Sequence, residues 1–339
     1  MRVKEVKYIK NGDILASPIY TDEKSILIPQ GAVLKEEYID LLLPLGIEVV
    51  EIEDNYSSIG KASLMIAETE KDRIKEELKK ILGKHIYSGK SSLSKIEGIA
   101  KELVQHIKNL DLECIYDIPY QKTDLYEHTI LVTLMSLILG RKNKLSDDDL
   151  QNIAVGCLLH DLGLRYITVP FVNTKIAELP PTDIFEYKKH TILAYTVLDE
   201  ESWLSQVSKN MILSHHEKLN GSGFPLKQKN QEMECRIIQL CDSFDCLISG
   251  MECERYPVER VMDYFVSVAG IKYDKELVDM LFSIIAKYPV GTEVELSDGK
   301  YGVVTSQTGD VQRPVVMLLE ESQFYNLEEN RKIHIVKTV

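Results

Sequence analysis

The sequence predicts a mainly α protein: a helical bundle with a small α/β unit before it and a small β unit after it. Helix-period apolar patterns dominate the middle of the 339-residue chain, and the pattern changes to period two after Val290. Five of the eight histidines lie between His128 and His216, inside the helical part. The four expected segments are an N-terminal α/β domain over residues 1–56, a helical connector over 57–114, a helical domain over 115–289 and a β unit over 290–339.

Composition and charge narrow the possible functions. The chain is 44% hydrophobic and 27% charged, as in ordinary globular proteins, and its net charge is -13. Binding to a DNA or RNA polymer needs a dense Lys/Arg surface, which this charge argues against. The N-terminus lacks the apolar core of a signal peptide, and no apolar stretch reaches the ~20 residues that span a bilayer. The six cysteines form no Cys-x-x-Cys pair, so we expect reduced thiols in a cytoplasmic protein without a membrane segment.

Short elements are expected in the N-terminal unit. Ile14-Leu15 and residues 26–28 are strand candidates, residues 35–43 suit a helix, and residues 48–52 suit a final strand. The following segment is charged and helical, with Ile74 and Leu78 on one apolar face. We expect it to pack on its neighbours, and a signalling or dimerising helix is the alternative.

The central segment contains the best-defined helix of the sequence. Ser146 and Asp149 form a capping-box pattern at its start. Apolar residues then follow at helical spacing, which predicts one buried face. His160-Asp161 comes at its end, with Gly163 just beyond as a candidate C-cap. Two further helices are expected, one ending at His215-His216 and one carrying Asp242.

The last segment alternates apolar and polar residues. Val294 and Leu296 alternate with Glu293, Glu295 and Ser297, and Asp298-Gly299 supplies a hairpin turn. Two more apolar runs follow before the end of the chain. This pattern predicts a small antiparallel β unit.

Histidines and aspartates of the central segment have the types and spacing of metal ligands. Imidazoles and carboxylates bind divalent first-row metals, and an aspartate has two oxygens with which to bridge two ions. One histidine alone is more often a structural group, and we assign no role to His85, His106 or His334. The joint pattern is different because it draws on at least five segments that a bundle can bring together. The candidates are Asp124, His128, His160, Asp161, His190, His215, His216 and Asp242.

These motifs resemble the HD-GYP family, a branch of the HD-domain phosphohydrolases, over about residues 120 to 260. The resemblance rests on Leu159-His160-Asp161-Leu162-Gly163, on Lys189-His190, on His215-His216-Glu217-x-x-Asn220-Gly221-x-Gly223-Phe224-Pro225, and on Cys241-Asp242-x-x-Asp245. It implies a helical bundle that holds two or three divalent metals, iron or manganese first, with zinc or cobalt as alternatives. It also implies hydrolysis of cyclic di-GMP.

The resemblance assigns roles to particular residues. Seven of the eight candidates match family metal ligands, while Asp124 stands where members with a third metal have glutamate. We expect a metal-bridging hydroxide to attack phosphorus, with Asp161 and Arg165 as the catalytic residues. The expected substrate-binding residues are Asn220, Gly221, Ser222, Gly223, Phe224, Pro225 and Arg255.

Several departures from the family affect the substrate rather than the metals. Leu164 replaces the usual lysine after the His-Asp motif, with Arg165 next to it, and Asn220 and Phe224 replace aspartate and tyrosine in the loop. In the usually basic stretch near residue 255, the sequence has Met251 and Glu254. We expect an intact metal centre and an altered substrate clamp, moved to Arg255 or lost.

Two other functions remain open. The domain could be a nucleotide-binding or protein-interaction module with little turnover, because the clamp residues are missing. It could also be an HD-type phosphohydrolase that acts on a nucleotide monophosphate or on a different phosphodiester, which the glycine-rich loop disfavours. Besides the substrate, the expected partners are a second copy of this chain, in a homodimer, or a signalling protein.

Overall fold

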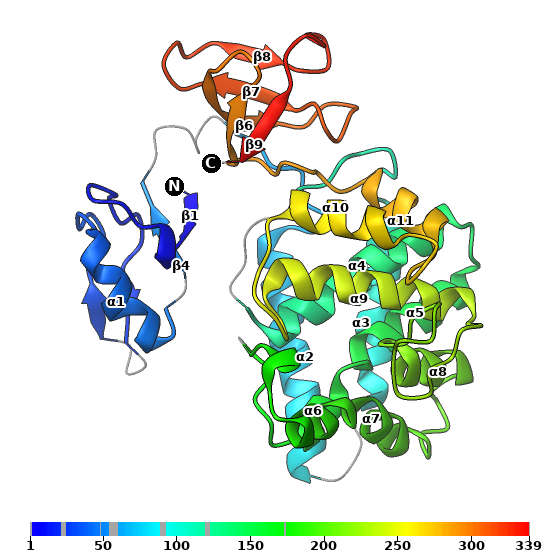
Figure 1. Ribbon diagram of the computed structural model, residues 1–339. Coiled ribbons are helices and arrows are strands. Elements are labelled where there is room, and N and C mark those ends of the chain that lie inside the picture. The colour runs from blue at the N-terminus through cyan, green and yellow to red at the C-terminus, as the bar shows by residue number, and fades with distance from the viewer. Residues whose placement is uncertain are drawn as a thin grey trace. The chain divides into compact units, whose positions relative to one another are not determined.

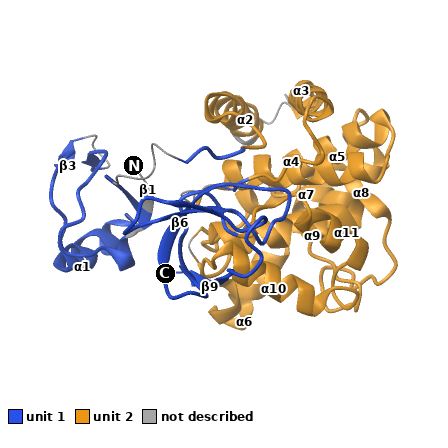
Figure 2. Cartoon of the chain, turned by 90° about the horizontal axis from the view of Figure 1, so that it is seen from above, with its two compact units in different colours: residues 1–63, 117–122, 288–339 blue, residues 64–116, 123–287 orange. Residues whose placement is uncertain are grey.

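The computed structural model describes residues 2–21, 25–47, 49–53, 60–88, 93–118, 123–172 and 174–338. The chain forms two compact units (Figure 2): residues 1–63, 117–122 and 288–339 make one, and residues 64–116 and 123–287 make the other. The predicted boundary between residues 56 and 57 lies outside the described residues. The four predicted segments remain a proposal.

The N-terminal part is a small α/β arrangement. Strand β1 (Arg2–Glu5) pairs antiparallel with β4 (Val49–Ile52), and β2 (Ile19–Tyr20) pairs with β3 (Ile26–Ile28). The predicted helix is a short α1 (Ile39–Leu42) between two 3-10 turns. Ile14 and Leu15, expected as a strand, form only isolated bridges, and Glu48 lies outside the described residues. The buried side chains of its core cluster are those of Val6, Ile9, Leu15, Ile19, Leu34, Leu42, Val50 and Ile52.

The second unit is helical throughout, as predicted, and Figure 1 shows its helices crossing around α4 and α9. Its helices are α2 (Glu68–Ser88), α3 (Ile96–Lys108), α4 (Leu125–Lys142), α5 (Asp147–Leu159), α6 (Pro181–Lys188), α7 (His190–Leu198), α8 (Gln206–Ser214), α9 (Met233–Ser249), α10 (Val258–Val268) and α11 (Lys275–Phe282). Buried Ile74 and Leu78 of α2 confirm the predicted apolar face of that helix.

Helix α4 forms the centre of the bundle. Every residue from His128 to Gly140 is buried, and the helix packs against α5 and α9 on different sides. This all-round burial explains the uninterrupted apolar sequence, because a helix without a polar face must be covered by other helices. None of the helices in the described part of the chain is apolar over enough residues to cross a bilayer.

Helix α5 begins as the sequence predicts. Both hydrogen bonds of the Ser146–Asp149 capping box are present, and the apolar face is buried. The prediction for Gly163 was wrong. His160 is the C-cap, a 3-10 turn follows over residues 162–166, and Gly163 does not adopt the left-handed conformation of a capping glycine. Glycine is needed for another reason: a Cβ atom would overlap the carbonyl oxygen of His190.

The C-terminal part is an antiparallel sheet, as its period-two pattern predicts. Gly299 turns the first hairpin with φ of 82°, and residues such as Val294 and Val316 fill the core on one face. The strands are β5 (Glu293–Leu296), β6 (Tyr301–Ser306), β7 (Val315–Leu318), β8 (Phe324–Asn326) and β9 (Ile335–Thr338), in the order β8-β7-β6-β5-β9.

Candidate metal centre and adjoining cavity

Helix ends place most of the predicted ligands. A residue at a helix terminus can turn its side chain inward while the chain changes direction, so separate helices can converge on one point. All seven ligands that match the family are buried. They are His128 in the first turn of α4, His160 and Asp161 directly after α5, His190 at the start of α7, His215 and His216 directly after α8, and Asp242 within α9.

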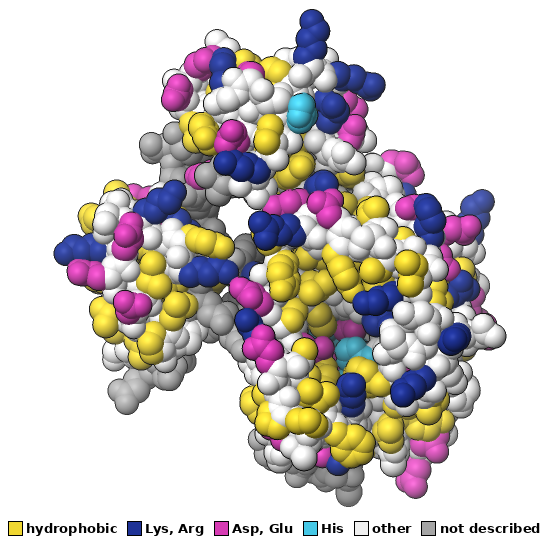
Figure 3. Space-filling view, viewed as in Figure 1, with side chains coloured by type: hydrophobic (Ala, Val, Ile, Leu, Met, Phe, Trp, Pro, Cys, Tyr) yellow, Lys and Arg dark blue, Asp and Glu magenta, His cyan; other side chains and the backbone are white. Residues whose placement is uncertain are grey.

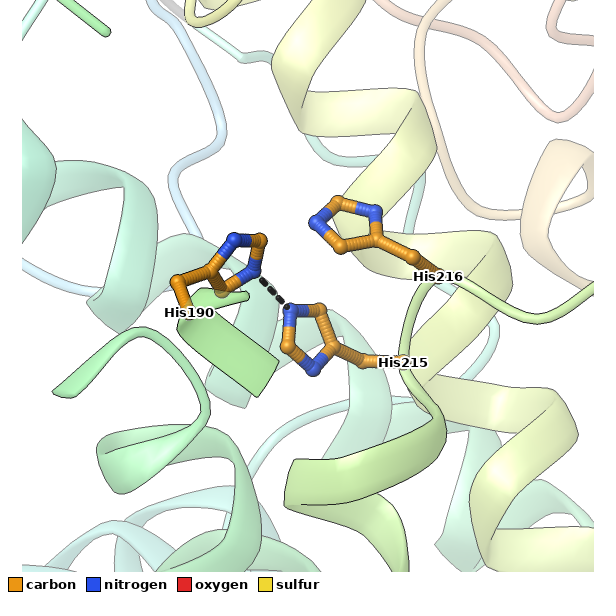
Figure 4. Close-up of side chains that lie close together, drawn as sticks. All are labelled: His190, His215 and His216. Carbon is orange, nitrogen blue, oxygen red and sulfur yellow. Dashed lines mark hydrogen bonds between the residues drawn. The ribbon is translucent and has the colours of Figure 1, made fainter. Parts of the chain in front are cut away.

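The inward-facing atoms form overlapping groups in which all ligand atoms lie within 4.8 Å of one another. Figure 4 shows one of them, in which the Nε2 atoms of His190 and His215 face each other at 3.1 Å. The groups are His190 with His215 and His216, His128 with His160 and Asp161, and His128 with Asp242 and Cys246.

Asp161 faces both histidine groups. Its Oδ2 atom lies 3.2 Å from Nε2 of His160 and 3.7 Å from Nε2 of His128. Its Oδ1 atom lies 3.6 Å from Nε2 of His215 and 3.7 Å from Nε2 of His190. One carboxylate therefore presents a separate oxygen to each group, which is the arrangement that a bridging ligand requires.

Asp242 approaches the same centre from α9. Its Oδ1 atom lies 3.3 Å from Nε2 of His128 and 3.7 Å from Nε2 of His160. Its Oδ2 atom lies 3.5 Å from Nδ1 of His216. The two aspartates thus line the centre from different helices.

Hydrogen bonds fix the orientation of four imidazoles. A backbone carbonyl can only accept, so an Nδ1 atom that contacts one must carry a proton, and in the neutral imidazole Nε2 then has the free lone pair. That lone pair points inward. In metal-binding histidines the same kind of hydrogen bond, made by the ring nitrogen that does not bind the metal, orients the ring. The Nδ1 partners are Cys157 O for His160 (2.6 Å), Tyr187 O for His190 (2.8 Å), Ile212 O for His215 (2.8 Å) and the Asp245 carboxylate for His128 (2.7 Å).

The donor set fits a cluster of divalent cations. Among the described residues, the buried oxygens Asp161 Oδ1 and Asp242 Oδ2 have no hydrogen-bond partner. Burial and the charge of His215 lower the pKa of His190 to about 4, so its imidazole is neutral at pH 7. Burial alone would raise the pKa of Asp161, but the surrounding imidazoles hold it well below 3.8. Burial lowers the pKa of His160, but the carboxylates of Asp161 and Asp242 outweigh it and raise that pKa to about 10, so a cation that binds there must displace a proton. Ionised carboxylates and deprotonated imidazole nitrogens are what such metals bind.

Asp245 is a positioning residue for the centre, and we expect Asp245→Ala to weaken metal binding about 10- to 100-fold. Its carboxylate holds Nδ1 of His128 at 2.7 Å, so removing it frees the ring to rotate. Metal affinity can be measured by titration of the metal-depleted protein. Asp245→Asn should recover part of the loss, and Glu234→Ala in the first turn of the same helix serves as the control. Equal affinities for all variants would exclude this role.

The glycine-rich loop packs against the centre. A Cβ atom on Gly223 would overlap the backbone of His216 and Glu217, so the close approach requires glycine. The buried Glu217 accepts hydrogen bonds from the loop amides of Leu226 (2.5 Å) and Lys227 (2.8 Å). The ring of Phe224 stacks on His216 with centroids 4.6 Å apart.

The other predicted loop residues lie farther out. Asn220 and Ser222 are exposed, and the Asn220 side chain accepts hydrogen bonds from the Ser222 amide (3.0 Å) and hydroxyl (2.7 Å). Gly221 turns the chain with φ of 77°, and Pro225 follows Phe224 through a cis peptide bond. Of the six loop residues, Phe224 makes the direct ring contact with a candidate ligand.

Three predicted residues have partners outside the ligand groups. Asp124 caps α4 by accepting from two backbone amides, and its other oxygen lies 3.2 Å from Lys75 Nζ. The Arg165 guanidinium donates to the Tyr126 hydroxyl. Arg255 donates to the carbonyl oxygen of Ser249 at 2.6 Å. Roles for these three in metal or substrate binding remain predictions.

Tyr187 and Glu252 border the centre and were not predicted as site residues. The Tyr187 hydroxyl donates to Glu252 and lies 3.4 Å from Nε2 of His216. Burial and the charges of Asp242 and Asp161 raise the pKa of Glu252 to about 8. Tyr187 could have been identified as a site residue from the sequence, because it lies only three residues before the candidate ligand His190. Glu252 lies in a loop after α9, where no periodic pattern indicates which way a side chain points.

A cavity of about 620 Å³ opens from the centre. The candidate ligands His216 and Asp242 line it together with Glu252, and the rest of the lining is hydrophobic, aromatic, polar and basic. Figure 3 shows a hollow in this unit, with histidine and acidic side chains at its bottom and hydrophobic side chains around it. This volume is in the range of pockets that hold small molecules.

Comparisons with known proteins agree with this site. Residues 115–277 match the family model of the HD domain. The chain is similar to the cyclic di-GMP phosphodiesterase PA4108 of Pseudomonas aeruginosa, with 25% identity over 54% of this chain and 45% of that protein. It is also similar to the cyclic di-GMP phosphodiesterase of Thermotoga maritima, with 26% identity over 49% of this chain and 46% of that protein. The chain therefore spans less than half the length of these relatives.

A solved structure shows the same fold. Bd1817, an HDG"Y"P protein from Bdellovibrio bacteriovorus, matches with a TM-score of 0.51 and 16% identity, and the match covers 82% of this chain and 97% of that chain. A helical bundle with histidines and aspartates gathered at one buried centre defines a metal-binding domain of the HD type. Residues 115–277 form an HD domain that is similar to those of the HD-GYP family.

Proposed function

We propose that this protein is a metal-dependent phosphodiesterase that hydrolyses a cyclic dinucleotide, with cyclic di-GMP as the first candidate. The observation that carries the proposal is the position of Asp161, which presents one oxygen to each of two histidine groups. The names of the curated relatives support the substrate class. A cytoplasmic location, and a homodimer or signalling partner, remain part of the proposal.

Two or three divalent cations, iron or manganese first and zinc or cobalt as alternatives, would be held by the seven buried ligands. Bound there, they would act as Lewis acids that lower the pKa of water and neutralise phosphoryl oxygens. Other residues of the chain orient the candidate ligands. The hydrogen bonds at Nδ1 keep the imidazole lone pairs inward, and the Phe224 ring covers one face of His216. Asp124 as a ligand of a third metal is a separate proposal.

Arg165 is the proposed group that contacts the phosphate in place of the missing lysine. Leu164, at the lysine position, is buried in an apolar cluster with Ile176 and Tyr187, so it offers no charge. We expect Arg165→Ala to lower kcat/KM about tenfold, since a hydrogen bond to a charged group contributes roughly 1.5–3 kcal/mol. Steady-state kinetics measure the effect, with Tyr126→Phe as a control for the hydrogen bond that Arg165 now makes. If Tyr126→Phe gives the same loss, Arg165 acts through Tyr126.

A hydrolysis screen tests the proposed function directly. Protein purified without oxygen and loaded with iron or manganese is incubated with cyclic di-GMP, cyclic GMP-AMP and cyclic di-AMP. We expect linear dinucleotide or mononucleotide products from at least one of them. If every substrate remains uncut although the protein has been loaded with each metal, the proposal is refuted.

The second candidate function is a nucleotide-binding or interaction module with little turnover. The buried, uncharged Leu164 and Met251 at usually basic positions favour it. Equal cyclic di-GMP binding by the natural protein and by His160→Ala, without hydrolysis by either, would support the module. Hydrolysis that depends on His160 would support the enzyme.

A further inference from the structure

Helix α10 contributes a wall of the cavity that the proposed function leaves unexplained. Arg260, Val261 and Tyr264 of this helix all line the cavity. Val261 is buried, whereas Arg260 and Tyr264 are exposed. The latter two are four residues apart, so their side chains lie on one face of the helix.

The two basic residues of the cavity differ in their partners. Lys218 is anchored: its Nζ atom donates to the Ser243 hydroxyl at 2.7 Å and lies 4.5 Å from the centroid of the Tyr273 ring. The guanidinium of Arg260 has no hydrogen bond or ion pair with the residues that the structure describes. Arg260 is therefore available to an anion that enters the cavity.

Tyr264 presents a ring that is held in place. Lys272 donates to its hydroxyl at 3.2 Å, and the Lys272 ammonium lies 5.6 Å from the ring centroid. Tyr264 is 38% exposed and lines the cavity, so part of this residue is open to a ligand. Aromatic rings in such positions stack on nucleic-acid bases, with little preference for one base over another.

A cyclic dinucleotide needs a cationic group and an aromatic ring away from the metal ligands. It carries two phosphates, and when one lies at the metal centre the other must be neutralised elsewhere. The positions that are usually basic in the family do not provide this charge. Met251 is fully buried, and the Glu254 carboxylate pairs with Lys175 at 3.3 Å.

We propose that Arg260, Tyr264 and Lys218 form the subsite for the second nucleotide of a cyclic dinucleotide, an inference that rests on the proposed function. The planar guanidinium binds the phosphate through two parallel hydrogen bonds, and the Tyr264 ring stacks on a base. Lys218, which lines the same cavity as His216 and Asp242, supplies a fixed positive charge.

Substitutions on α10 test the subsite. Metal-loaded protein is assayed with cyclic di-GMP for KM and kcat, and with titration calorimetry for Kd. We expect Arg260→Ala and Tyr264→Ala each to raise KM and Kd about tenfold, with kcat changed less than about twofold and metal content unchanged. Tyr264→Phe keeps the ring and should retain affinity. Arg331→Ala removes an exposed arginine from the C-terminal β unit and is the matched control.

The outcomes separate this inference from the proposed function. Hydrolysis by the natural protein, with unchanged KM and Kd in both alanine variants, overturns the subsite and leaves the phosphodiesterase standing. Binding of cyclic di-GMP that depends on Arg260 and Tyr264, without hydrolysis of any of the three cyclic dinucleotides, supports the subsite and overturns the phosphodiesterase. No binding of cyclic di-GMP by the natural protein overturns the subsite, and equal losses in Arg331→Ala show a general charge effect that also overturns it.

Discussion

Replacing Asp161 by asparagine should reduce hydrolysis of the cyclic dinucleotide by roughly 10³-fold or more, because metal ligation contributes several kcal/mol to the transition state. Its carboxylate has a separate oxygen facing each histidine group, at 3.2 Å from Nε2 of His160 and 3.6 Å from Nε2 of His215. Asparagine keeps the shape but removes the negative charge and one of the two anionic oxygens. The bound metal should fall with the activity, and both are measured on the same preparation, by elemental analysis and by product formation.

Asp148→Asn is the matched control for this substitution. Asp148 is an exposed aspartate in the first turn of α5, the same helix that leads to His160 and Asp161. Its replacement should leave metal content and rate nearly unchanged. An Asp161→Asn variant that kept full metal content and full activity would show that Asp161 does not bridge the two groups.

Replacing Gly163 by alanine should destabilise the domain by about 1–3 kcal/mol or more, because a tightly packed site cannot accept an added methyl group. The new Cβ would overlap the carbonyl oxygen of His190, a backbone atom that can move only with the start of α7. Since His190 is the first residue of that helix, the same shift should lower metal content. Chemical denaturation measures the stability, and elemental analysis measures the metal.

Gly98→Ala gives the opposite expectation and serves as its control. Gly98 is exposed within α3, and a Cβ atom there would meet no atom within 4 Å. Alanine in a helix interior is favoured over glycine by roughly 0.5–1 kcal/mol, so this variant should be slightly more stable. If both variants had the stability of the natural protein, the close contact between Gly163 and His190 would be wrong.

Local sequence patterns predicted the helices that carry the ligands. The Ser146–Asp149 capping box and the apolar spacing after it depend on residues within one helix, and both are present in the structure. The same holds for α9, where apolar residues at helical spacing surround Asp242. The C-terminal sheet was equally predictable, since alternation and a glycine turn are local features.

Features that depend on contacts between distant segments were harder to predict. Gly163 appeared to be a C-cap because it follows a helix. Glycine is required at this position because the backbone of His190, on another helix, lies too close for a side chain. Glu252 is placed by backbone hydrogen bonds between its loop and the loop at residues 171–176. Spacing along the chain contains no information about such contacts.

The convergence of the ligands was predicted only as a consequence of the joint pattern. Sequence indicated that His128, His160 and His215 lie in different segments of the helical domain, and the resemblance to a family supplied the expectation that they meet. The structure brings their Nε2 atoms to one buried centre. The substrate side was less predictable, because Arg260 and Tyr264 belong to a helix outside the motifs.

The metal-to-protein ratio of protein purified without oxygen is the most direct test of the central claim, that these buried side chains form a cluster site for divalent cations. Elemental analysis should find about two or three divalent ions per chain, as in clustered catalytic sites. The ratio should fall in Asp161→Asn and remain unchanged in Asp148→Asn. A natural protein without bound metal, even after incubation with iron or manganese, would contradict the account.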